Sequence, residues 1–228
     1  MLIKWGSIIV KGSGKLGGHV FSSGNSGASV HTLARARNPQ TKDQEAVRSR
    51  FTAFTQGWRD LTESQRESWY AAESSYSRTN RFGDVVSLTG KNLYESLNSQ
   101  RNIIGLNTLQ IAPMPTKLIK NVVETVRILP GQGLIEIKGR FAHSQNFVIV
   151  ATPSLSLGTQ YGSGSLRIIG IEPSTQFGEK IIVTGAVYND YVSKFGVPPT
   201  NGKIFIGTYS INESGQKSSI STVIATYT

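Results

Sequence analysis

The sequence contains no cysteine, and this absence excludes two classes of protein. Without thiols there is neither a disulfide framework nor a thiolate metal site, and the remaining nitrogen ligands are three histidines, His19, His31 and His143. No second histidine at a ligand spacing, acid pair or nucleophile elbow surrounds any of them. We therefore expect no structural metal and no cofactor.

Long apolar runs are also missing. No stretch approaches the roughly 18 apolar residues that a membrane-spanning helix requires. The apolar residues among the first ten positions are interrupted by Lys4, Gly6 and Ser7, which does not fit a secretion signal. We expect a protein that makes no membrane contact and is soluble in the cytoplasm of the cell that produces it.

The residue types from which active sites are built are scarce. Fourteen acidic residues and three histidines leave few combinations for acid–base or nucleophilic chemistry. Gly12-Ser13-Gly14-Lys15 has the glycines and lysine of a phosphate-binding loop, but Leu16 and two glycines follow, so the GxxxxGK spacing is absent. The sequence indicates a protein that is not an enzyme.

Positive charge is the most prominent feature that the sequence does have. It holds 24 Lys and Arg against 14 Asp and Glu, a net charge of +10, and residues 1–42 contain no acidic side chain. Such a segment attracts nucleic acid phosphates or an acidic protein surface, and charge alone does not choose between them. The residues expected to make these electrostatic contacts are Lys4, Lys11, Lys15, Arg35, Arg37, Arg48 and Arg50.

Residues 1–40 are rich in glycine, with seven within the first 31 positions. This composition resists packing on itself, so a flexible tail is one interpretation. The apolar side chains among the glycines favour another, an extended basic arm that binds along a partner's sheet or groove. The partner-docking residues expected in this arm are Trp5, Val20 and Phe21.

Residues 41–111 show helical periodicity and predict a small helical domain. Thr41 and Gln44 have the spacing of a capping box, and Thr62 and Gln65 repeat it. Apolar residues at spacings of three and four follow the first box and predict one buried helical face: Val47, Phe51, Phe54, Trp58 and Leu61.

A second helix should carry Trp69, and a third is expected from about Thr89 to Ile104, with Gly105 as its cap. The pattern marks the aromatic side chains of these helices as core residues. Trp58 and Trp69 are nevertheless also candidates for contact with a docking partner.

Residues 112–228 follow a stiff linker, Ala112-Pro113-Met114-Pro115, and contain seven β-like segments bounded by turn residues. These are 122–129, 134–139, 146–151, 166–171, 180–184, 203–211 and 218–226. Seven short strands in about 117 residues predict a β-sandwich of immunoglobulin or fibronectin type. A short helix ending at Gly196 interrupts them. The expected fold class is therefore α+β and multidomain: arm, helical domain and sandwich.

An ordered set of motifs spans about residues 11–104. In chain order its main members are Gly17-Gly18-His19-Val20-Phe21, Asn38-Pro39-Gln40-Thr41, Trp58-Arg59-Asp60-Leu61-Thr62, Gln65-Arg66, Trp69 and Leu88-Thr89-Gly90. The pattern resembles a family of uncharacterised structural proteins of tailed bacteriophages, including those of Bacteroidetes and crAss-like phages. The resemblance implies a place in the virion and supplies no catalytic residues.

The leading hypothesis is a non-enzymatic virion protein, made in the host cytoplasm, that docks onto capsid, neck, portal or tail proteins through its arm and helices. Many symmetric copies would then strengthen individually weak contacts. A first alternative is a DNA-binding or packaged protein without sequence preference, which would use the basic residues. A second is a glycan-binding or host-attachment role for the β-domain.

Overall fold

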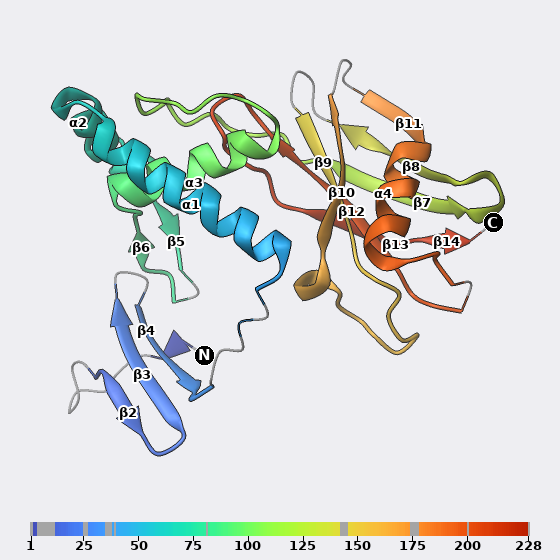
Figure 1. Cartoon of the computed structure of the whole chain (residues 1–228), viewed down its shortest axis with the longest axis horizontal. Helices are drawn as coiled ribbons and strands as arrows, with labels where there is room; N and C mark the ends of the chain where they lie inside the picture. Colours follow the sequence, from blue (N-terminus) through green and yellow to red (C-terminus); the bar gives the residue numbers. More distant parts are fainter. Residues whose placement is uncertain are drawn as a thin grey trace. The chain divides into compact units, whose positions relative to one another are not determined.

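The computed structural model describes residues 2–3, 12–24, 27–34, 38, 40–80, 82–141, 146–173, 178–199 and 201–227, with backbone alone for residues 2, 78, 173 and 178–183. The fold is mixed α+β, as predicted (Figure 1). It divides into two compact units, one of Met1–Glu95 with Gln110–Pro113 and the other of Ser96–Leu109 with Met114–Thr228. One boundary between the units, at Pro113, therefore coincides with the predicted linker. Another lies inside the third helix, between Glu95 and Ser96.

The N-terminal segment contains a small antiparallel sheet of order β1-β4-β3-β2. Its strands are β1 (Leu2–Ile3), β2 (Gly14–Leu16), β3 (His19–Gly24) and β4 (Gly27–Thr32). A two-residue turn joins β2 to β3, and Gly17 has a φ of 57° there, which suits glycine. Phe21 pairs across the sheet with Val30. The expected extended arm is thus wrong for residues 14–24 and 27–32, which form strands of one sheet, with Gly17 and Gly18 in the turn between β2 and β3.

Both predicted capping-box positions begin helices, but only the second forms the complete reciprocal box. The Thr41 hydroxyl accepts from the Gln44 N–H at the start of α1 (Lys42–Asp60), and Thr62 and Gln65 cap each other's backbone at the start of α2 (Glu63–Ala71). A short 3₁₀ turn (Glu73–Tyr76), strands β5 (Arg78–Thr79) and β6 (Val85–Val86), and α3 (Gly90–Ile103) follow. The predictions of these three helices are confirmed.

Aromatic packing forms the core of the first unit. The Tyr94 ring lies 5.5 Å from the Trp58 ring and 5.3 Å from the Trp69 ring, centroid to centroid. The Trp69 indole N–H also donates to the Gln110 carbonyl at 2.9 Å, and the Tyr76 hydroxyl donates to the Pro113 carbonyl at 2.9 Å. These bonds hold the segment that follows α3 against α2 and the 3₁₀ turn.

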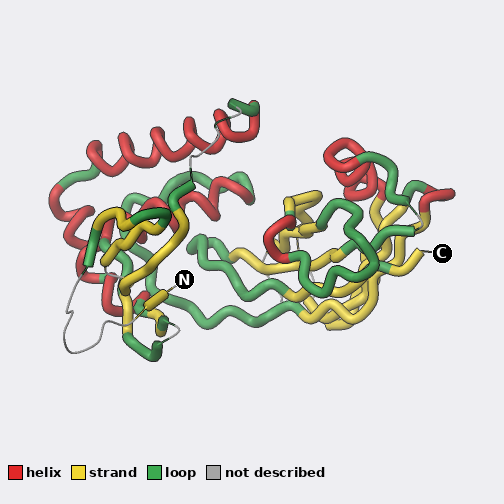
Figure 2. The backbone as a smooth tube through the Cα atoms, turned by 90° about the horizontal axis from the view of Figure 1, so that it is seen from below, coloured by secondary structure: helices red, strands yellow, loops and turns green. Residues whose placement is uncertain are grey.

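The second unit contains two four-stranded sheets, of order β11-β8-β7-β14 and β10-β9-β12-β13. Most of the regular elements of this unit are strands, joined by long loops (Figure 2). The strands are β7 (Val122–Leu129), β8 (Leu134–Phe141), β9 (Asn146–Ala151), β10 (Arg167–Pro173), β11 (Gly178–Thr184), β12 (Phe205–Ile211), β13 (Ser221–Ile224) and β14 (Thr226–Tyr227). The predicted segment 218–226 contributes to two strands, β13 and β14, which join different sheets.

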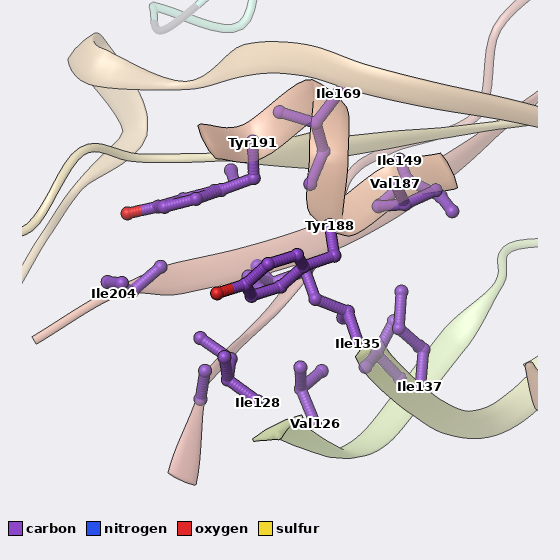
Figure 3. Close-up of a cluster of buried hydrophobic side chains, with 14 of the residues drawn as sticks. Val126, Ile128, Ile135, Ile137, Ile149, Ile169, Val187, Tyr188, Tyr191 and Ile204 are labelled. Carbon is purple, nitrogen blue, oxygen red and sulfur yellow. The ribbon is translucent and has the colours of Figure 1, made fainter. Parts of the chain in front are cut away.

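One apolar core lies between these sheets, as in a β-sandwich. Ile128 and Ile137 come from one sheet and Ile149 from the other (Figure 3), and all three are fully buried, as is Ile206 on β12. Helix α4 (Gly185–Phe195) adds Tyr188 and Tyr191 to the same core, and ends at Gly196 as expected. Burial and the neighbouring Tyr227 raise the pKa of the Tyr191 phenol, which keeps that side chain neutral.

The sheet that contains β9 and β12 is covered on both faces. Val148, Val150, Tyr209 and Ile211 face away from the shared core, and Ile103 and Ile104 at the end of α3 pack against them. The Asn98 side chain bonds both the N–H and the carbonyl of Leu109, at 2.7 and 3.3 Å. The second half of α3 is therefore part of the β-rich unit.

We expect Gly139→Ala to destabilise the second unit by about 2 kcal/mol or more, because strands β7 and β8 leave no space for a methyl group. A Cβ at Gly139 would overlap the Val122 carbonyl oxygen and lie 3.1 Å from the Val123 Cα. Gly131→Ala is the matched control, since nothing lies within 4 Å of its Cβ position. Urea unfolding of both variants checks this; equal stabilities would contradict the close packing.

Candidate interaction surfaces

Two of the predicted docking residues are buried. Trp69 is 0% exposed and Trp58 is 8% exposed, and both rings contact Tyr94 in the core of the first unit. The docking role expected of them is wrong, since rings buried where α1, α2 and α3 pack together present no surface to a partner. Trp5, Lys4, Lys11, Arg35 and Arg37 lie outside the described residues, as does His143.

Val20 and Phe21 are partly exposed and lie on opposite faces of the N-terminal sheet. Phe21 pairs with Gly14 on β2 and Val30 on β4, whereas Val20 pairs with Lys15 and His31. Because successive residues of a strand point to opposite faces, one face carries Phe21 with Val30 and the other carries Val20 with the basic Lys15. The two apolar residues do not form one docking patch.

The described basic residues do not form one patch either. Arg48 donates to the Asn38 side-chain oxygen at 2.7 Å, and Arg50 donates to the Ala46 carbonyl at 3.4 Å. Two residues apart on a helix, they are separated by about 200° around its axis. Lys15 is exposed on β2, away from this helix in the chain.

The N-terminal half of α1 exposes the apolar stripe that its C-terminal half buries. Val47 is 44% and Phe51 49% exposed, whereas Phe54 is 6% exposed. The prediction of one buried face is therefore wrong for the first half. The described contacts of α2 and α3 with α1 lie in its C-terminal half, where Trp58 meets Tyr70 and Tyr94, and the 9 residues of α2 are too short to reach the rest of the 19-residue α1. We call Val47 and Phe51 the α1 face.

Arginines flank the α1 face on both sides. On a helical projection Arg48 follows Phe51 by about 60°, and Arg50 lies about 60° beyond Val47 in the other direction. Both arginines are exposed. The face thus presents an apolar strip between two positive charges. Such a face is complementary to a partner surface that is apolar and has acidic residues beside it.

A further surface, not predicted from the sequence, lies at the connection between β9 and β10. Tyr161 is 85% and Leu157 72% exposed on this connection. Tyr161 borders a pocket of about 90 Å³. The signal in the sequence is an isolated aromatic residue within a stretch of Gly, Ser and Thr.

Within the described ranges, no three His, Asp or Glu side chains gather closely enough to hold a metal ion. None of the helices in the described part of the chain is both long and apolar enough to cross a bilayer. A scan against models of known protein families gives no match, and a search of curated proteins gives none either.

Exposure of the α1 face predicts a contrast between two phenylalanines three residues apart. Phe54→Ala should lower the free energy of unfolding by about 3–5 kcal/mol, because it leaves a cavity in the aromatic core. Phe51→Ala should change it by less than about 1 kcal/mol, because half of that ring already contacts solvent. Chemical denaturation followed by tryptophan fluorescence measures both. A large loss for Phe51→Ala would show that the α1 face is covered within the chain.

Proposed function

We propose that the chain is a structural protein of a tailed-phage particle, present in many copies, that docks onto a capsid, neck or tail protein through the α1 face. The observation that carries the proposal is the half-exposed stripe of Val47 and Phe51, which continues the buried stripe of the same helix. The motif pattern of residues 11–104 supplies the phage context. The partner surface should be apolar with acidic neighbours, since arginines border the face.

The size of the α1 face explains why many copies would be needed. Val47 and Phe51 are each about half exposed, so covering them stabilises a complex by roughly 2 kcal/mol in total. A single contact of this strength does not hold two proteins together. Repeated copies on a symmetric shell or tail would raise the local concentration and make the assembly stable.

We also infer that the β-rich unit follows the fibronectin type III plan. With strands named in chain order, A, B and E correspond to β7, β8 and β11, and C, C′, F and G to β9, β10, β12 and β13. The order E-B-A in one sheet and C′-C-F-G in the other supports this. Helix α4 between E and F is an addition to it. Such a unit serves as a spacer or a second contact surface.

The DNA-binding alternative receives less support from the described residues. It needs cations gathered along one groove, and Arg48 and Arg50 point to different sides of α1 while bonding to the chain itself. DNA binding is therefore kept as one possible outcome of the experiment on purified particles and purified chain.

The experiment is cross-linking mass spectrometry of purified particles, with Lys42 at the first turn of α1 as the reporter. We expect cross-links from Lys42 to a capsid, neck or tail subunit. In particles grown with the Val47→Ser/Phe51→Ser variant, the copy number of the chain should fall at least about tenfold, as expected from the loss of roughly 1.4 kcal/mol or more.

Val85→Ser is the matched control, because Val85 is 75% exposed in the same unit and lies outside the α1 face. This variant should enter particles at the wild-type level. Absence of the wild-type chain from purified particles would overturn the proposal. Binding of the purified chain to duplex DNA that weakens steeply with salt would then favour the DNA-binding alternative.

A further inference from the structure

The connection between β9 and β10, residues 152–166, is held in place by specific bonds to the start of β12. Leu155 and Lys203 exchange two backbone hydrogen bonds of 2.9 Å. The Phe205 N–H donates to the buried Thr152 hydroxyl at 3.0 Å, and the Thr152 N–H donates back to the Phe205 carbonyl at 2.9 Å. A connection anchored in this way presents its side chains in a fixed arrangement.

Lys203 and Gly162 fix the part of the connection next to Tyr161. The Lys203 ammonium donates to the Thr159 carbonyl at 2.7 Å and lies 5.5 Å from the centre of the Phe205 ring. At Gly162 a Cβ would come within 2.7 Å of the Phe205 ring, so a residue without a side chain is needed for the backbone to pass so close. The backbone around Tyr161 is therefore held in place, while the Tyr161 ring itself faces solvent.

The pocket beside Tyr161 combines an apolar floor with uncharged hydrogen-bonding groups. The apolar part of its lining comes from Leu166 and Phe205, and the polar part from Gln160, Ser163 and Thr222. Among the described residues, none of these three polar side chains makes a hydrogen bond to another protein group. Three amide or hydroxyl groups are thus free to bind a ligand.

The chemistry of the lining selects a class of ligand. Neither an acid nor a base lines the pocket, and the nearby Lys203 charge is engaged by Thr159 and Phe205. A phosphate or carboxylate would find no cation in the lining itself, and the nearby Arg167 guanidinium donates to the Leu166 carbonyl at 2.9 Å. A volume of about 90 Å³ is too small for a cofactor, since cofactor and drug sites measure roughly 300–1,000 Å³. An exposed aromatic ring beside amide and hydroxyl groups suits a ligand with an apolar face and several hydroxyls.

We propose that this surface is a binding site for a neutral saccharide, in which Tyr161 stacks against the C–H face of a sugar ring. Gln160, Ser163 and Thr222 bond the hydroxyl groups of the same sugar, one edge of which enters the pocket above Phe205. This activity is separate from the proposed structural role, because the purified chain would bind the sugar whether or not it belongs to a particle.

The test applies the purified full-length chain to a glycan array that carries neutral and anionic saccharides, including mannose-, galactose-, glucose- and N-acetylglucosamine-terminated chains. We expect binding to neutral members. The affinity for the best of them, measured by NMR titration, should fall at least about tenfold in Tyr161→Ala and stay within about threefold in Tyr161→Phe, which keeps the ring.

Thr222→Val provides a second variant, since it removes a hydroxyl and keeps the shape of the side chain, and it should weaken binding by a few fold. Phe51→Ala, which removes a half-exposed ring from another surface, should leave sugar binding unchanged. Because Tyr161 is 85% exposed, Tyr161→Ala should unfold at the wild-type temperature.

Three outcomes would overturn the proposal. These are no binding of wild type to any neutral saccharide, binding of anionic saccharides alone, and equal affinity in wild type and Tyr161→Ala. If particle cross-links involve this connection while no sugar binds, the surface is a protein contact instead.

Discussion

Burial of β9 and β12 on both faces is the constraint on which the β-rich unit depends. One face of these strands contributes Ile149 and Ile206 to the core between the sheets, and the other contributes Val148 and Tyr209 to a second cluster. A strand that is buried on both sides needs apolar residues at successive positions, and β9 reads Asn-Phe-Val-Ile-Val-Ala. The second face is covered by Ile103, the last residue of α3, and by Ile104, which follows it.

Other features of this unit follow from that arrangement. The end of α3 has to stay on the sheet, and the Asn98 amide fixes the return of the chain by bonding both backbone groups of Leu109. Because the Asn98 side chain is fully buried, water cannot take the place of Leu109 in these hydrogen bonds. The start of β12 in turn anchors the connection that carries Tyr161. A surface proposed for ligand binding is thus supported by the most buried strands of the unit.

The two proposed surfaces differ in how the fold exposes them. On α1, an apolar stripe continues beyond the reach of the shorter α2, so Val47 and Phe51 remain in solvent. On the β9–β10 connection, hydrogen bonds and the space left by Gly162 place Tyr161 outward. The first surface is an apolar strip between charges and suits a protein partner. The second is neutral and polar around one ring and suits a sugar.

The sequence by itself determined the local structure. An N-cap at Thr41 and a capping box at Thr62 start helices, Gly196 ends one, and alternating residues form most of the expected strands, because each of these signals acts within a few residues. Tertiary structure decided which of these residues are exposed. Half of the α1 stripe is exposed because α2 and α3 contact the other half, Trp58 and Trp69 are enclosed, and part of the expected arm pairs into a sheet. The local signal at Tyr161 is limited to an isolated aromatic residue among Gly, Ser and Thr, because its exposure depends on bonds between residues about 40 to 50 positions apart, such as those of Lys203 and Phe205. Burial depends on which elements meet and how long they are, and a single stretch of sequence does not contain that information.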